Sequence, residues 1–278
     1  MKKDTKIKQL CDAYVAEPHY LTHLSPSTIN CFLSNKPAFI GKFLKFPRTD
    51  NINFQKGNTV ERAVNFYFND IDSKYPQFAE YAENVNGDRN ESTRLAMNIF
   101  QKEAKLMDKF QETLNYLPAL CLKAIDTYSE LNSKPACQVE LRGELFGAQI
   151  FGIADYIFDK VHDCKVTGKT PKEMSVAHKI AANIYGKLTN KEVVYDYFIP
   201  LKSEMRHAPI NFQNSPTIDS LTEAAIHTIL SMNDYLKLDP ERIYEYASLF
   251  LQDPELGYFE SPIEYWIDDD PKPLLERE

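Results

Sequence analysis

Residues 151–169 read FGIADYIFDKVHDCKVTGK, and this stretch decides the fold. Its two halves, up to residue 158 and from residue 161, are rich in β-branched and aromatic side chains, which predicts two short strands. The first half nevertheless contains Asp155, and the second contains Asp163 and Lys165. Aspartate and lysine are depleted in strand interiors, so these three side chains indicate a role besides folding.

The length of the turn between the two strands decides whether the three charged side chains meet. Strand side chains alternate between faces, so Asp163 and Lys165 lie on the same face. A two-residue turn would send Asp155 to the opposite face. A three-residue loop over residues 158–160, or an equivalent bulge, instead places Asp155 opposite Asp163. We therefore predict the odd-length loop or a bulge.

Helical and strand patterns surround this hairpin. Ser25 or Ser27 is a candidate N-cap, and Pro37 begins a second helical segment. A further helix is expected to start after Gly57, with Glu61 in its first turn. The remaining predicted elements are a helical insertion over residues 71–132, strands over 138–146 and 191–202, and helices over 175–188, 219–236 and 240–251.

This order predicts an α/β (α+β) fold with an αβββαβ core, in which helices flank a mixed sheet. The chain has 278 residues and 43% hydrophobic content, enough to bury a large core, and we expect residues 1–278 to form one domain. The insertion then lies within that domain, and residues 203–278 form a C-terminal helical wrap with an acidic tail.

Membrane segments and structural cysteines are not expected. No run of about 18 apolar residues occurs, and the N-terminus has no hydrophobic segment, so we predict neither a membrane span nor a secretory signal, and a cytoplasmic location. The five cysteines are scattered and form no CxxC pair, which argues against a disulfide framework, a zinc site or an iron–sulfur cluster. They are expected to be thiols.

Five short motifs occur in a fixed order along the chain. They are SPSTI with KPAFI near residues 25–40, Gly57 to Glu61, Gly152 to Asp155, Asp163 to Lys165 followed by Thr167 and Gly168, and Tyr185. In this order they resemble the PD-(D/E)xK phosphodiesterase superfamily, which has a restriction-endonuclease-like core, and specifically its RecB-like exonuclease branch. The resemblance covers residues 24–202 outside the insertion. Asp163 and Lys165 alone could be an exposed strand face, but the ordered set argues against that.

The resemblance implies a metal-dependent nuclease site. Asp155, Asp163 and the backbone carbonyl of Cys164 would bind Mg²⁺ or Mn²⁺, and Glu61 would complete or extend the ligand set. These are the hard oxygen ligands that such cations prefer. Lys165, either with its pKa lowered by the metal or as a plain cation, would orient the attacking water and stabilise the charge that develops on phosphorus.

Two departures from the family pattern limit the resemblance. The usual glutamine four positions before the helix tyrosine is Ala181 here, so its contact is absent or is replaced by Asn183 or His178. Lys36 stands before Pro37, where the iron–sulfur members place their first cysteine, and the late cysteine group is missing too. The resemblance therefore implies a nuclease without an iron–sulfur cluster.

DNA is the expected partner, although the net charge of -8 and the pI near 5.4 are unusual for a protein that coats nucleic acid. Global charge does not describe a single groove, and carboxylates that bind metal add to the negative total. A free helix start at the serines and a local basic cluster favour phosphate contacts. The DNA-contacting residues that we expect are Ser25, Ser27, Lys42, Thr167, Lys169 and Tyr185.

Three functions remain after these arguments. The first is a metal-dependent DNA exonuclease similar to the small RecB-type enzymes of phages, bacteria and mitochondria, which act on single strands or DNA ends in repair, recombination or replication. The second is a non-catalytic protein that binds DNA ends or a partner. The third is a structure-selective endonuclease. The residues leave polarity, DNA against RNA, metal count and oligomeric state open, and the cytoplasm of a phage-infected cell is one possible setting.

Overall fold

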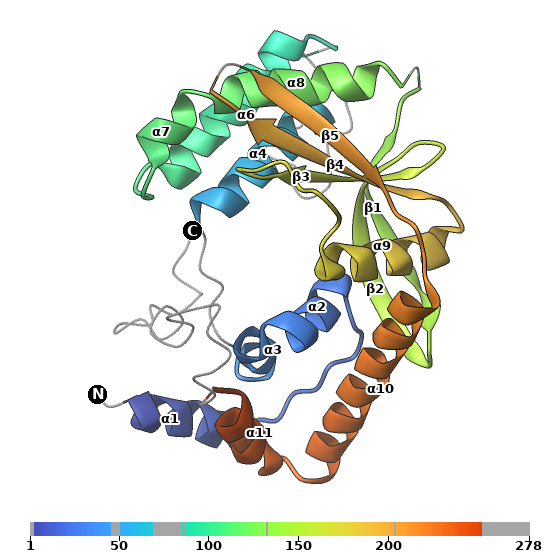
Figure 1. Ribbon diagram of the computed structural model, residues 1–278. Helices are drawn as coiled ribbons and strands as arrows, with labels where there is room; N and C mark the ends of the chain where they lie inside the picture. The colour runs from blue at the N-terminus through green and yellow to red at the C-terminus, as the bar shows by residue number, and fades with distance from the viewer. Residues whose placement is uncertain are drawn as a thin grey trace. The chain divides into compact units, whose positions relative to one another are not determined.

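The computed structural model describes residues 3–45, 51–68, 85, 87–131, 133–202 and 204–251 (Figure 1). The chain forms two compact units. Unit 1 comprises residues 1–49, 143–151 and 216–278, and unit 2 comprises residues 50–142 and 152–215. In the described ranges, no helix combines the length and the apolar character that a membrane crossing requires.

A five-stranded mixed sheet has the spatial order β1-β2-β3-β4-β5 (Figure 1). Its strands are β1 (Ala136–Leu145), β2 (Ala148–Ile157), β3 (Val161–Val166), β4 (Val193–Pro200) and β5 (Met205–Asn211). β3 runs antiparallel to β2 and parallel to β4, and β5 returns antiparallel to β4. The parallel pair is connected through the helix α9 (Val176–Thr189), the crossover that a parallel pair needs.

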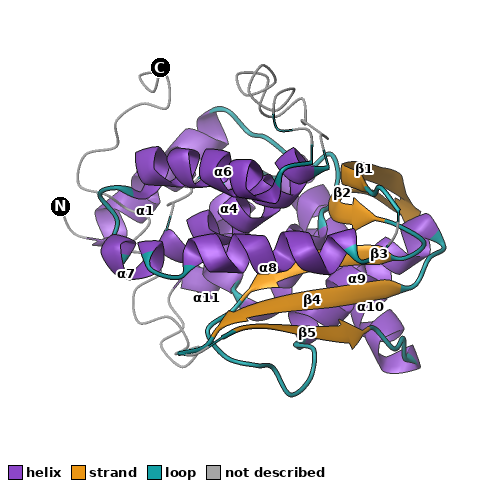
Figure 2. Cartoon of the chain, turned by 90° about the horizontal axis from the view of Figure 1, so that it is seen from above, coloured by secondary structure: helices purple, strands orange, loops and turns teal. Residues whose placement is uncertain are grey.

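Helices cover both faces of the unit 2 part of the sheet (Figure 2). On one face, α4 (Ile52–Tyr67), α6 (Arg89–Ala104) and α8 (Leu117–Ser129) share an apolar cluster with Tyr156, Cys164 and Phe198 of the strands. α9 packs on the other face, where its residues meet Val161 and Tyr195. The short helix α7 (Phe110–Leu114) joins α6 to α8. The insertion helices are thus part of the core of this unit.

Unit 1 is built mainly from helices. They are α1 (Lys3–Ala16), α2 (Pro26–Ser34), α3 (Lys36–Phe43), α10 (Pro216–Leu238) and α11 (Arg242–Leu251). Ser25 caps α2, because its hydroxyl accepts a hydrogen bond from the backbone N–H of Thr28 at 3.1 Å. Asn35 ends α2 and caps α3 in the same way, with Ala38 N–H as the donor.

The fold class is confirmed: this is an α/β chain with a mixed sheet flanked by helices, and its core order is the predicted αβββαβ. The strand β5 was not predicted, because residues 203–278 were expected to be helical. The single-domain boundary stays a prediction. Three predicted features lie wholly or partly outside the described residues: the acidic tail from Ile267, residues 71–84, 86 and 132 of the insertion, and Arg48, which with Lys42 and Lys45 makes up the local basic cluster.

The start of α4 corrects a second expectation. The helix begins at Ile52, where the side chain of Asn51 accepts hydrogen bonds from the N–H groups of Asn53 and Phe54. Gly57 is therefore inside the helix, and Glu61 lies in the third turn and not in the first. Gly57 was expected to precede the helix, whereas Asn51, six residues earlier, caps its first turn.

Replacing Gly57 by alanine should raise the free energy of unfolding by about 0.5–1 kcal/mol, because glycine in a helix interior is costly. A Cβ at this position would have no heavy atom within 4 Å. Urea unfolding followed by circular dichroism measures the change. Gly87→Ala is the control of opposite sign, since Gly87 has φ +77° and alanine there should destabilise by about 1 kcal/mol. Destabilisation by Gly57→Ala would contradict the helix start at Ile52.

Candidate metal-dependent hydrolytic site

The two faces of β3 carry different chemistry. Asp163 pairs with Tyr195 of β4, and Lys165 pairs with Tyr197, in the parallel register. Tyr195 and Tyr197 belong to the apolar cluster under α9, so Asp163 and Lys165 lie on the α9 face. Cys164 belongs to the opposite cluster. The alternation expected from the sequence therefore holds.

The hairpin loop has the predicted odd length. Ile157 pairs with Val161, so residues 158–160 form a three-residue connection, and Tyr156 pairs with His162. Continuing the same register by one position places Asp155 opposite Asp163. The regular pairing of β2 with β3 stops before that point, where Asp155 Oδ2 accepts the hydrogen bond from Cys164 N–H at 2.8 Å. The Asp155 carboxylate thus accepts the hydrogen bond that a backbone carbonyl of β2 would accept in a regular strand pair.

Three oxygens surround the ammonium group of Lys165. It forms an ion pair with Asp163 Oδ1, lies 3.7 Å from Asp155 Oδ2 and donates a hydrogen bond to the Cys164 carbonyl at 3.1 Å. Asp163 is only 4% exposed. The two carboxylates and the carbonyl are the oxygens that the sequence analysis assigned to the metal, and in this structure they converge on one cationic group.

Burial and charge shift the ionisation of this cluster. Burial favours the neutral form of Lys165, but the charges of Asp163 and Asp155 outweigh it and hold the pKa of Lys165 well above its ordinary value. Burial, with the neighbouring charge of Asp163, raises the pKa of Asp155 to about 6, although Lys165 opposes the shift. Lys165 is therefore a cation at neutral pH, and Asp155 titrates close to neutrality.

Glu61 and Tyr185 approach the same cluster from two helices. The charge of Glu61 raises the pKa of Cys164, after the larger effect of burial. Burial is also the main reason that the pKa of Tyr185 is raised, and the charges of Asp163, Asp155 and Glu61 add to it. The backbone carbonyl of Glu61 accepts a hydrogen bond from Tyr156 Oη at 3.3 Å, which ties α4 to β2.

The other predicted DNA contacts are dispersed. Ser25, Ser27 and Lys42 belong to unit 1, where Ser25 caps α2 and its hydroxyl lies 2.9 Å from that of Ser27. Thr167 and Lys169 follow β3 in unit 2, and the Thr167 hydroxyl donates to the Lys169 carbonyl at 3.3 Å. These contacts with DNA stay predictions.

Sequence reasoning missed an aromatic and histidine layer beside Lys165. The ammonium lies 5.7 Å from the ring centroid of Tyr195, in the range of a cation–π contact. His178 of α9 stacks on Tyr195 with centroids 4.8 Å apart, and its Nδ1 is 2.7 Å from Tyr197 Oη. Burial, with the charge of Lys165, lowers the pKa of His178 to about 4, so this ring is neutral at pH 7. The alternating Tyr195-Asp196-Tyr197 of β4 was the available signal.

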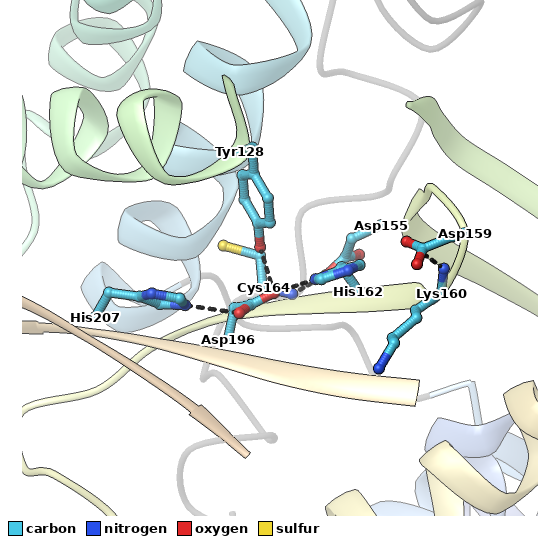
Figure 3. A network of polar contacts seen from close by, with 8 residues as sticks. All are labelled: Tyr128, Asp155, Asp159, Lys160, His162, Cys164, Asp196 and His207. Atoms are coloured by element: carbon cyan, nitrogen blue, oxygen red, sulfur yellow. Dashed lines mark hydrogen bonds and ion pairs between the residues drawn. The ribbon is translucent and has the colours of Figure 1, made fainter. Parts of the chain in front are cut away.

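A second polar cluster lies on the opposite face of the sheet (Figure 3). Asp196 is buried and accepts hydrogen bonds from His162 Nδ1 at 2.8 Å, His207 Nε2 at 2.6 Å and Tyr128 Oη at 3.2 Å. Burial opposes ionisation of Asp196, but the hydrogen bonds from the two histidines lower its pKa below the ordinary value. Through these hydrogen bonds the cluster connects β3, β4, β5 and α8, and Asp196 pairs with Cys164 of the neighbouring strand.

The donor set at Lys165 fits a hard divalent cation. In the part of the chain that the structure describes, no three His, Cys, Asp or Glu residues are grouped closely enough to form a metal site by themselves. The third converging oxygen is the Cys164 carbonyl, a main-chain atom. Carboxylate and carbonyl oxygens suit Mg²⁺ or Mn²⁺ and do not suit soft metals.

Comparisons with known proteins add only distant likenesses. Neither a family model nor a curated protein matches the sequence. A candidate exonuclease from Eubacterium rectale is 14% identical, with a TM-score of 0.43 over 86% of this chain and 84% of that one. The protein SSO0001 is also 14% identical, with a TM-score of 0.33 over 81% of this chain and 85% of that one. Neither likeness assigns a function.

Asp155→Asn should stabilise the metal-free protein at neutral pH. The pKa of Asp155 is about 6 in the folded protein and about 3.9 in an unfolded chain. Between these values the folded state binds more protons, so wild-type stability falls as the pH rises from about 4 to 6 and stays lower above that range. The variant should therefore gain about 2–3 kcal/mol above pH 7 and almost nothing at pH 4.

Urea unfolding in a chelating buffer at both pH values measures this gain. Asp159→Asn is the matched control, because it makes the same substitution at an exposed position of the same hairpin. An equal gain for Asp155→Asn at pH 4 and pH 7.5 would contradict the raised pKa.

Asp196→Ala should lower the free energy of unfolding by about 3 kcal/mol or more at neutral pH, because three donors lose their partner in a buried site. The depressed pKa means that the carboxylate contribution is complete at neutral pH and is lost only as the pH falls below about 4. Urea unfolding tests both statements. The control is Asp126→Ala, which removes the exposed ion pair with Arg89 and should lower the free energy of unfolding by less than about 1 kcal/mol. An equal loss of stability in both variants would contradict the stabilising role of the cluster at Asp196.

Proposed function

We propose that this chain is a metal-dependent deoxyribonuclease that hydrolyses phosphodiester bonds and acts as an exonuclease on single strands or DNA ends. One observation carries the proposal: Asp155, Asp163 and the Cys164 carbonyl converge on the Lys165 ammonium at the point where β2 and β3 stop pairing. Such a group of oxygens beside a permanent cation suits in-line displacement at phosphorus, which needs charge neutralisation on both sides of the reacting atom.

Asp155, Asp163 and the Cys164 carbonyl would hold Mg²⁺ or Mn²⁺, and the carboxylate of Glu61 would extend the ligand set from α4. A bound ion of this kind supplies Lewis acidity, which favours hydroxide formation from water and neutralises charge on the phosphate. The resemblance in sequence motifs and the donor chemistry support the same assignment. This ion is thus the proposed cofactor, without an iron–sulfur cluster.

Lys165 acts as a cation in this mechanism. Its raised pKa keeps it protonated at neutral pH, so the ammonium donates hydrogen bonds to the attacking water and to a phosphate oxygen and does not remove a proton. The ring of Tyr195 and the neutral His178 limit the directions in which the side chain can lie. Tyr185, which is buried beside the carboxylates, closes the α9 side of the site against water.

The loss of folding stability caused by the charged site favours a catalytic protein over one that only binds DNA. Desolvation and the neighbouring charge of Asp163 raise the pKa of Asp155 and so reduce stability at neutral pH, and a purely structural hairpin has no need of this pair of carboxylates. A protein that only bound DNA ends could dispense with this cost. The hydrolytic centre of an endonuclease would be the same, so the substrate test below distinguishes cleavage at ends from internal cleavage.

Linear and circular DNA, single-stranded and double-stranded, should separate these functions when each is incubated with the protein and Mg²⁺ or Mn²⁺. We expect end-labelled linear DNA to be degraded, circular DNA to survive, and chelation to stop the reaction. Asp163→Asn and Lys165→Ala should each lower the rate by about a hundredfold or more, because each removes charge stabilisation of the transition state. Gel analysis of labelled products measures the rates.

Asp159→Asn serves as the matched control and should keep the wild-type rate, since Asp159 is exposed at the tip of the same hairpin. Cleavage of circular DNA would select the endonuclease. Binding of DNA ends without any cleavage in either metal would refute the proposed activity and leave the non-catalytic protein.

A further inference from the structure

A groove of about 510 Å³ in unit 2 is not used by the site described above. The N-terminal part of α4, the segment around α7, and the loops that follow β3 and β4 form its walls. Lys56, Lys109 and Lys202 line it from three different elements, together with Tyr116 and Gly168. Cationic side chains and an aromatic ring thus face the same space.

Two chain segments lead directly from the candidate site to this groove. Lys56 precedes Glu61 by five residues on α4, which corresponds to a rise of about 7–8 Å. Gly168 follows Lys165 by three residues, a span of at most about 10 Å in an extended chain. Gly168, which lines the groove, is therefore joined to Lys165 by no more than about 10 Å of chain. A strand that continues from Lys165 past Gly168 would enter the groove.

The lining suits a single nucleic-acid strand. Lysines recognise phosphates as point charges, and an aromatic ring offers a stacking surface to any base. Lys56 Nζ lies 6.0 Å from the Tyr116 ring centroid, so the cation and the ring are neighbours. Gly168 has open space where a Cβ would be, which lets a ligand approach the backbone closely.

Backbone strain marks one wall of the groove. Lys109 has φ +61° and ψ +13° at the start of α7, with no side-chain cap, and this left-handed conformation is unfavourable for a residue other than glycine. Strained backbone conformations of this kind are found preferentially at functional sites. The same segment also contains Asp108 and Glu112, so the lysines that line the groove from other elements are Lys56 and Lys202.

We propose that this groove binds the part of the nucleic-acid strand next to the bond that is cut. The phosphates lie along Lys56, Gly168 and Lys202, and one base stacks on Tyr116. This inference rests on the proposed nuclease function, which it extends by naming how the strand is held beyond the reacting phosphate. Asp108 and Glu112 repel phosphate and so disfavour a path of the strand along their own segment.

Fluorescence anisotropy with a short labelled single-stranded oligodeoxythymidylate, in a chelating buffer that prevents cleavage, tests the proposal. The double variant Lys56→Ala/Lys202→Ala should weaken binding about tenfold and reduce the salt dependence by about 1.4 in log–log slope, because two phosphate contacts are lost. Tyr116→Ala should weaken binding about fivefold or more through lost stacking. Glu112→Gln should strengthen it.

The matched control is Lys102→Ala/Lys105→Ala, which removes the same charge from exposed positions at the end of α6, away from this groove. Equal weakening by both double variants would overturn the groove and indicate a general charge effect. Wild-type binding that is unchanged in Lys56→Ala/Lys202→Ala and in Tyr116→Ala would do the same, while the nuclease proposal stands if the wild type still cleaves DNA. A wild type that neither binds nor cleaves would refute the nuclease function itself.

Discussion

The odd length of the loop between β2 and β3 is the constraint on which the charged site depends. With three residues in the loop, Asp155 shares the α9 face with Asp163 and Lys165; with two, it would face the apolar cluster around Tyr128, where an unpaired carboxylate is very costly. Contacts hold this loop length in place. Phe158 stacks on Tyr128 with ring centroids 6.0 Å apart, and Lys191 Nζ donates to the carbonyls of Phe158 and Asp159.

The same alternation lets one sheet carry two polar clusters without conflict. In the parallel register, Asp163 and Lys165 meet Tyr195 and Tyr197, whereas Asp196 points the other way toward His162 and His207. The cluster at Asp196 fixes the relative position of β3 and β4 from the face opposite to Asp163 and Lys165. The fixed position of β3 matters for the proposed metal site, because the Cys164 carbonyl could serve as a ligand only if β3 does not shift along its neighbours.

The parts of this arrangement that follow local rules could be predicted from the sequence. Alternation and turn length placed Asp155, Asp163 and Lys165 together, because strand geometry depends only on spacing. β5 was missed because its residues, MRHAPIN, do not alternate regularly between apolar and polar and include Pro209, which suits an edge strand but weakens the strand pattern. Without β5, His207 could not be assigned to Asp196. The proximity of His178 to Lys165 depends on how α9 packs, which no local pattern encodes.

The proposed action on DNA has to be compatible with the charge of the site. With Asp155, Asp163 and Glu61 ionised and Lys165 protonated, the proposed site has a formal charge of three negative and one positive, or -2, which repels a phosphate. Asp163 is buried, so salt screens its part of this repulsion poorly. One divalent cation cancels the charge and a second would reverse it. In the proposed function, affinity for the strand would come from cations outside the site, and Lys56 and Lys202 of the groove are such a pair in unit 2. Binding of the strand at a separate place is compatible with an acidic hydrolytic site.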